Sequence, residues 1–146
     1  MYSLLRAALL IALLCLALPA RAQLVVIVNA AAGVEQLSKA QVINIFLGRN
    51  REYSNGQSAV PLDLPASSPD KALFYRNLVN KDLEQMDAYW ARLVFAGNTS
   101  PPRLALSALD AVQQVSTNPG AIAYVERKDV NSSRVRIVFS VGGVNN

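Results

Sequence analysis

The sequence predicts an α/β fold in which a mostly parallel sheet is flanked by helices. Residues 24–28, LVVIV, are apolar without alternation, which is typical of a strand covered on both faces. A helical pattern and a second strand pattern follow, and this early alternation favours α/β layering. Three more helical patterns then precede two final strand patterns. One sheet with helices on its faces is the simplest arrangement of this order.

The start of the chain predicts a secretory signal peptide over residues 1–22. Arg6 supplies positive charge, residues 7–18 are continuously apolar, and Ala20 and Ala22 form a small-x-small cleavage pattern. The apolar run is shorter than the roughly 20 residues that span a bilayer. An uncleaved anchor, or a lipoprotein attached through Cys15, are the alternatives. After cleavage we expect no stable membrane insertion.

Cleavage leaves residues 23–146, which can form one domain with its own core but not two. The whole chain has 14 Lys and Arg against 10 Asp and Glu. Removal of Arg6 and Arg21 lowers the basic count to 12, so the net charge of the mature chain is +2. No long basic block occurs, and nucleic-acid binding has little support.

Two residue types are absent from the mature chain. The only Cys lies in the predicted leader, and the chain has no His. Disulfides, most zinc sites, Ser-His-Asp triads and Cys-His pairs are therefore not expected. Asp63 is a lone carboxylate at a strand end, so general acid–base work is not supported. We expect a non-enzymatic protein with no metal and no cofactor.

The first helix and the second strand are predicted from local signals. Ser38 and Gln41 form a capping box, and Gly48 ends the helix that they start. The helix presents Val42, Ile45 and Phe46 on one face. A polar segment with an Asn-Gly turn signal follows, and residues 60–64 form the second strand pattern.

The remaining elements are predicted from periodicity. Residues 69–79 and 82–94 form two helices, the second with a buried face and an aromatic group expected in the core. A helix starting at Ser107 is expected to carry an apolar face, residues 121–125 form a short strand, and residues 135–141 alternate as a half-buried strand. The expected apolar residues are Leu83, Met86, Tyr89, Trp90, Leu93, Phe95, Leu109, Val112 and Val115.

The stretch DLPASSPDKALF, residues 63–74, has two interpretations. As plain structure, Ser68 is an N-cap whose hydroxyl accepts a first-turn N–H, Pro69 fits the first helical position, and Asp70 complements the helix dipole. As a site, the same free N–H groups bind phosphate or another oxyanion. Pro69 removes one donor and Asp70 adds a like charge, while Lys71 or Arg76 could supply a cation. Both interpretations stay open at this point.

The predicted site also includes a residue from the first strand. In parallel sheets, ligands lie beyond the carboxyl ends of the strands, where helices begin. Asn29 follows the first strand, and Ser67 and Ser68 follow the second. We therefore expect Asn29 to face the loop, with the two serine hydroxyls donating to the anion and Lys71 beside them.

Three segments resemble phosphate-type periplasmic substrate-binding proteins, namely LSKAQVINIFLG (37–48), AYWARLVFAG (88–97) and NPGAIAYV (118–125). With the stretch AVPLDLPASSPDKALFYRNLV between them, the likeness covers nearly all of the mature chain. It resembles the small stand-alone members of that group. The resemblance implies a type II periplasmic binding protein-like domain over residues 23–146, reduced to a single lobe. It also implies a periplasmic or secreted location, phosphate or a similar oxyanion as ligand, and an inner-membrane permease or sensor as partner.

The chain departs from the pattern of that group at the ligand site. Larger members hold phosphate partly with an arginine and a Ser-Gly-Thr turn at a helix start, and residues 64–70 contain neither. Only Ser67 and Ser68 carry over. Ala123 replaces the usual glycine of the last motif. The alternative hypothesis is a protein-interaction module of the cell envelope that kept the fold, lost the ligand, and docks on a membrane receptor or sensor.

Overall fold

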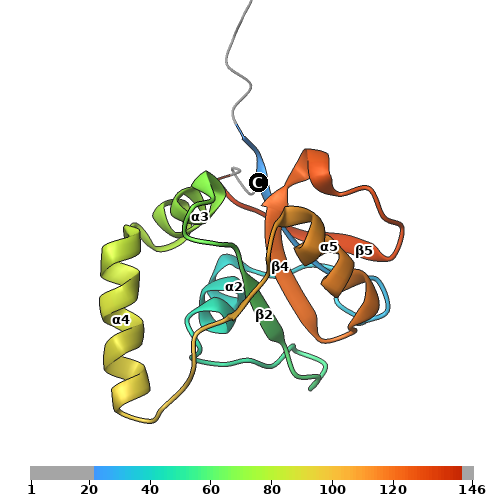
Figure 1. The fold of residues 1–146 in the computed structure, drawn as a ribbon. Coiled ribbons are helices and arrows are strands. Elements are labelled where there is room, and N and C mark those ends of the chain that lie inside the picture. Colours follow the sequence, from blue (N-terminus) through green and yellow to red (C-terminus); the bar gives the residue numbers. More distant parts are fainter. Residues whose placement is uncertain (1–21, 143–146) are drawn as a thin grey trace, which may run out of the picture.

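The structure is a computed structural model that describes residues 22–142, and the predicted signal peptide lies outside this range except for Ala22. A five-stranded sheet runs through the molecule between helices (Figure 1). The elements are β1 (Leu24–Asn29), α2 (Lys39–Phe46), β2 (Val60–Asp63), α3 (Pro69–Val79), α4 (Leu83–Phe95), β3 (Arg103–Leu104), α5 (Ala108–Thr117), β4 (Ala121–Glu126), the 3-10 helix η1 (Arg127–Asp129) and β5 (Val135–Ser140).

The strand order is β3-β2-β4-β1-β5, and one strand runs against the others. β2 is parallel to β3 and to β4, whereas β1 is antiparallel to β4 and to β5. Four strands therefore share one direction, which confirms the mostly parallel α/β class, and β1 alone is reversed. All six residues of β1 are buried, as its apolar run predicts. The expectation that β1 runs parallel to its neighbours was wrong. An apolar run indicates that a strand is covered on both faces, but it does not indicate the direction of the strand.

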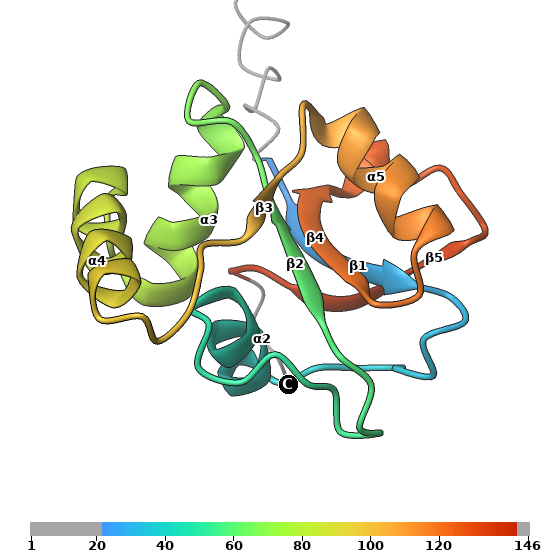
Figure 2. The same ribbon diagram turned by 60° about the horizontal axis from the view of Figure 1, so that its bottom comes forward.

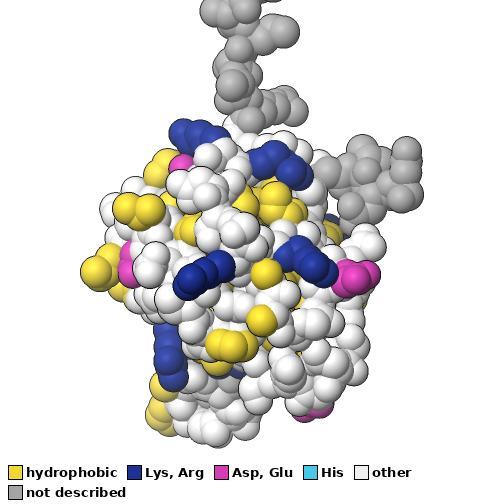
Figure 3. Space-filling model, turned by 90° about the vertical axis from the view of Figure 1, so that its right-hand side faces the viewer, with side chains coloured by type: hydrophobic (Ala, Val, Ile, Leu, Met, Phe, Trp, Pro, Cys, Tyr) yellow, Lys and Arg dark blue, Asp and Glu magenta, His cyan; other side chains and the backbone are white. Residues whose placement is uncertain are grey.

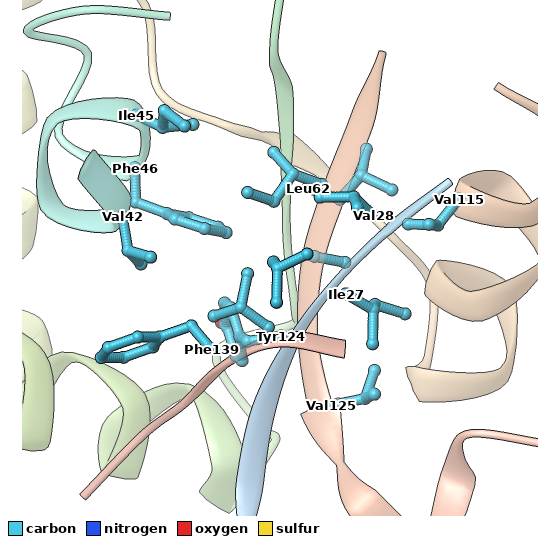
Figure 4. Close-up of a cluster of buried hydrophobic side chains, with 14 of the residues drawn as sticks. Ile27, Val28, Val42, Ile45, Phe46, Leu62, Val115, Tyr124, Val125 and Phe139 are labelled. Carbon is cyan, nitrogen blue, oxygen red and sulfur yellow. The ribbon is translucent and has the colours of Figure 1, made fainter. Parts of the chain in front are cut away.

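The helices form layers on both faces of the sheet. α5 covers one face, and α2 and α3 cover the other, with α4 packed outside α3 (Figure 2). Figure 4 shows the two halves of the core, with Val42, Ile45 and Phe46 of α2 on one side of the strands and Val115 of α5 on the other. The strands are continuously apolar because they are covered from both sides.

Three of the four described α-helices begin at a side-chain cap, and the caps at Ser38 and Ser107 were predicted. The Ser38 hydroxyl accepts from the Gln41 amide and closes a capping box, and Asp82 does the same with Gln85. The Ser107 hydroxyl accepts from the Asp110 amide at the start of α5. α3 begins differently, as described below.

Two hydrophobic side chains expected in the core are exposed instead. Leu109 is 73% exposed and Phe95 is 95% exposed. At about 100° per residue, Leu109 lies about 110° from the middle of the buried face of α5, and Phe95 lies on the opposite side of α4 from Met86 and Trp90. Both were assigned to the core because they are apolar, although their helical positions point away from it.

Both ends of the described chain meet at the edge of the sheet where α3 begins. β1 starts opposite the end of β4, with Leu24 paired to Glu126. The Val141 amide donates to the Leu24 carbonyl at 2.9 Å just after β5 ends. Within residues 22–142, no helix has both the length and the apolar character needed to span a membrane.

Candidate functional site

The start of α3 has no side-chain cap. The loop after β2 turns through a bond from the Ser68 amide to the Pro65 carbonyl at 2.9 Å, and Pro69 is the first helical residue. Ser68 is the N-cap residue with extended backbone, but its hydroxyl accepts no first-turn N–H. The Lys71 amide instead bonds the Ser68 carbonyl at 3.2 Å. The predicted capping bond of Ser68 is therefore wrong, while its N-cap position is confirmed.

The serines and the lysine of the predicted site lie at this turn with different exposure. Ser67 is exposed and Ser68 is half-buried, so both hydroxyls are open to a solute. Lys71 is more enclosed, with 19% of its side chain exposed. Its Nζ lies 3.5 Å from the Asp63 Oδ2, so the cation nearest the turn is already in contact with a carboxylate.

Asp63 is the centre of a buried polar network at the end of β2. Its residue exposure is 7%. Oδ1 accepts from the Leu64 amide at 3.1 Å and from the Tyr124 hydroxyl, and Oδ2 accepts from the Tyr75 hydroxyl at 3.0 Å. Burial, and then the Asp63 charge, raise the pKa of both tyrosines far above the ordinary value, so both stay protonated as donors. Within the described residues, no buried side-chain polar atom lacks a partner.

A group of carboxylates faces the first turn of α3. Burial raises the pKa of Asp70, and the Glu126 carboxylate raises it further through its charge and a hydrogen bond. Asp129 adds to the same effect, while Lys128 opposes it and pairs with Glu126 at 3.1 Å. These acids disfavour a fully ionised anion beside the helix start, because like charges repel in a partly dry setting.

Asn29 lies away from this turn. Because β1 runs against β2, the end of β1 and the end of β2 are at opposite edges of the sheet. The Asn29 amide donates to the carbonyls of Val115 at 2.9 Å and Ser116 at 3.2 Å, and its oxygen accepts from the Ala31 amide at 2.8 Å. Asn29 therefore holds the last turn of α5 and a tight turn after β1. The expectation that it faces Ser67 and Ser68 was wrong, and the reason is the reversed direction of β1.

Sequence reasoning missed the partners of Asp63. Tyr75 and Tyr124 come from α3 and β4, 12 and 61 positions along the chain. The only signal in the sequence was the carboxylate itself, which ends an apolar strand and would be costly to bury without donors. That signal predicts that partners exist but does not identify them.

Sequence reasoning also missed an exposed hydrophobic strip, which consists of Leu104, Leu106 and Leu109. It runs from β3 into the first turn of α5, with exposures of 60%, 80% and 73%.

On the side of the molecule shown in Figure 3, hydrophobic side chains lie among separate Lys and Arg side chains, without a continuous basic surface. Within the described residues, no group of His, Cys, Asp or Glu is arranged to hold a metal ion.

Comparison with solved structures identifies the fold. An ABC-type phosphate transport receptor from Vibrio cholerae matches with a TM-score of 0.63 at 17% identity, over 80% of this chain and 45% of the receptor. PstS from Borrelia burgdorferi matches with a TM-score of 0.61 at 13% identity, over 80% of this chain and 46% of PstS. No protein-family pattern and no curated protein matches the sequence. The described chain therefore has the fold of the phosphate-type periplasmic substrate-binding proteins, of which it spans less than half the length.

Proposed function

We propose that the mature chain is an exported, non-enzymatic solute-binding protein that takes a small oxyanion, phosphate first, at the start of α3. The observation that carries the proposal is the uncapped first turn. Among the α-helices of the described chain, α3 alone has no bond from its N-cap side chain to its first turn. Pro69 has no N–H and the Lys71 amide donates to the Ser68 carbonyl, so the Asp70 amide is the first-turn N–H left for an oxyanion, at the positive end of the helix. The hydroxyls of Ser67 and Ser68 and the ammonium of Lys71 complete the donor set.

The carboxylates near this turn favour a protonated oxyanion. Asp70 and Glu126 would repel an anion with no proton, but a carboxylate accepts a strong hydrogen bond from a P–OH group. Phosphate keeps such a proton near neutral pH, whereas sulfate and nitrate have none. The expected order of affinity is therefore phosphate above sulfate and nitrate.

The proposed binding is weak. Ser67 is exposed, so water stays near the charge and screens each contact. A dissociation constant of about 1 mM corresponds to only about 4 kcal/mol of binding free energy, which a few exposed hydrogen bonds can supply. A partner that covers the turn would tighten the complex by excluding water.

Calorimetry on the mature protein, residues 23–146, tests the proposal. Phosphate at millimolar concentration should give heat and raise the melting temperature, and sulfate and nitrate should give less of both. Ser68→Ala and Lys71→Ala should weaken phosphate binding, while Lys39→Ala, an exposed lysine on α2, should not. The absence of heat and of a thermal shift with all three anions would overturn the proposal.

Export to the periplasm and an inner-membrane permease or sensor as partner belong to the same proposal. They are supported by the predicted leader and by the likeness to phosphate transport receptors. Amino-terminal sequencing of the protein recovered from osmotic-shock fluid should begin at Gln23. Recovery of an uncleaved chain in the membrane fraction would contradict this part.

A ligand-less interaction module is the second candidate, and the hydrophobic strip of Leu104, Leu106 and Leu109 favours it. Three exposed leucines in so short a stretch are more typical of a contact surface than of a free one. A photo-crosslinking residue at position 106 should trap an envelope protein in cells. The same residue at position 113, an exposed glutamine of α5, serves as the control. Equal trapping at both positions would count against the module.

A further inference from the structure

We infer that Asp63 sets the strength of anion binding at the start of α3 by competing with the anion for the Lys71 ammonium. The inference rests on the proposed function, because it concerns the same turn. It makes Asp63 a positioning residue that acts through Lys71 and touches no solute itself. Tyr75 is the second residue of this device, since it shares one carboxylate oxygen with Lys71.

The two carboxylate oxygens of Asp63 have different partners. Oδ1 is occupied by the Leu64 amide at 3.1 Å and by the Tyr124 hydroxyl. Oδ2 is shared by the Tyr75 hydroxyl at 3.0 Å and the Lys71 Nζ at 3.5 Å. Lys71 contacts Asp63 through Oδ2, so the strength of this ion pair depends on how much of that oxygen the Tyr75 hydroxyl already occupies.

The Lys71 contact is longer than a full charge-assisted bond. Such bonds between ammonium and carboxylate are about 2.7–2.9 Å long, and this contact is 3.5 Å. The ammonium therefore has donors left for another acceptor. Asp63 is buried, so removal of its cation costs free energy that hydration of the carboxylate does not offset. An oxyanion at the turn must consequently compete with Asp63 for Lys71.

Two substitutions should change anion affinity in opposite directions. Asp63→Asn removes the charge that holds Lys71, so phosphate affinity should rise by about tenfold. Tyr75→Phe removes the other donor to Oδ2 and leaves that oxygen to Lys71, so phosphate affinity should fall severalfold. Both changes disturb the same buried network, so a merely structural role would weaken binding in both variants.

The test is calorimetry with inorganic phosphate on the mature protein and on both variants. Circular dichroism first establishes that each variant is folded at the measuring temperature. Each change is repeated in a Lys71→Ala background, where both effects should disappear. Tyr53→Phe, which removes a buried hydroxyl that donates to the Gly120 carbonyl, is the matched control and should leave affinity unchanged.

The outcomes separate this inference from the proposed function. Tighter binding by Asp63→Asn together with weaker binding by Tyr75→Phe supports the inference. If the unmodified protein binds phosphate and Asp63→Asn binds it equally or less well, the inference is overturned and the proposed function stands. If only Asp63→Asn binds phosphate, the inference holds and native phosphate binding is overturned. Failure of all folded variants to bind overturns both.

Discussion

The rings of Phe74 and Tyr124 are stacked, with centroids 3.8 Å apart and an angle of 6° between their planes. Both side chains are fully buried, and Phe46 packs edge-on against each of them. The far end of Tyr124 is its hydroxyl, which donates to Asp63 and also accepts from the Leu64 amide at 3.2 Å. One side chain therefore joins the hydrophobic core to the buried polar network.

Tyr124→Phe should keep the stack and destabilise the fold. The change removes one donor from a buried carboxylate, and such losses cost about 1.5–3 kcal/mol. Tyr53→Phe removes a donor from a neutral carbonyl that also accepts from the Val60 amide, and should cost only about 0.5–1.5 kcal/mol. Urea unfolding of both variants measures the difference. Equal losses of unfolding free energy would show that the hydrogen bond to the Asp63 carboxylate is no stronger than the one to the Gly120 carbonyl.

Gly48→Ala should destabilise more than Gly97→Ala. Both glycines have φ of +70°, so each alanine incurs the left-handed backbone cost of about 1–2 kcal/mol. A Cβ at position 48 would also lie 2.7 Å from the Thr99 Oγ1, whereas a Cβ at position 97 would meet nothing within 4 Å. We expect an additional loss of about 1–3 kcal/mol for Gly48→Ala. Thermal or urea unfolding that ranks the two variants equally would contradict the close approach of Thr99.

Asn29→Asp should destabilise strongly at neutral pH and less in acid. The new carboxylate would face the carbonyls of Val115 and Ser116, and an uncompensated buried charge costs about 3–5 kcal/mol. Burial and the two carbonyls raise the pKa of that carboxyl in the folded state. The folded variant therefore binds the proton more tightly than the unfolded chain, and its free energy of unfolding rises as the pH falls.

The matched control for that substitution is Asn29→Ala, whose loss relative to the unmodified protein should not depend on pH. Unfolding measured at about pH 7 and about pH 4.5 separates the two variants, since an ordinary aspartate titrates near 3.9. Phosphate affinity should be unaffected in both, because Asn29 lies at the opposite edge of the sheet from α3. A loss of affinity without a loss of stability would contradict this placement.

Asp70→Asn should stabilise the protein at neutral pH and have no such effect in strong acid. Burial and the Glu126 charge raise the pKa of Asp70 in the folded state. The folded protein then binds that proton more tightly than the unfolded chain, so stability falls as the pH rises through the raised pKa. Asparagine does not ionise, so the variant does not lose this stability as the pH rises. Because Asp70 is only half-buried and water screens its charge, the melting temperature should rise by only a few degrees or less. Melting curves across pH 3 to 8 that keep a constant difference would contradict the assignment.

Much of the fold could be predicted from local signals. The range of α3 matches its prediction because Pro69 and the apolar periodicity mark both ends. β3 was missed, since Arg103–Leu104 is too short to show a period and follows two prolines. The reversal of β1 was missed for another reason. Strand direction depends on pairing with β4 and β5, which lie about a hundred residues or more along the chain.

The candidate site was predictable only in part. The position of Ser67, Ser68 and Lys71 at a helix start follows from the sequence, because capping chemistry is local. The engagement of Lys71 by Asp63 does not, since it depends on how α3 is turned against the end of β2. The Glu126 carboxylate reaches Asp70 only because β4 ends beside the same turn. In each case the missing information is a contact between segments distant in sequence.

The bond between Val141 and Leu24 keeps the two ends of the described chain together, at the end of the sheet where α3 begins. A tag joined close to either of these two ends can therefore shade the first turn of α3 from solutes. A surface attachment meant to leave that turn open belongs instead at the far edge, in the tight reversal around Gly56, whose side of the sheet is shared with Gly120.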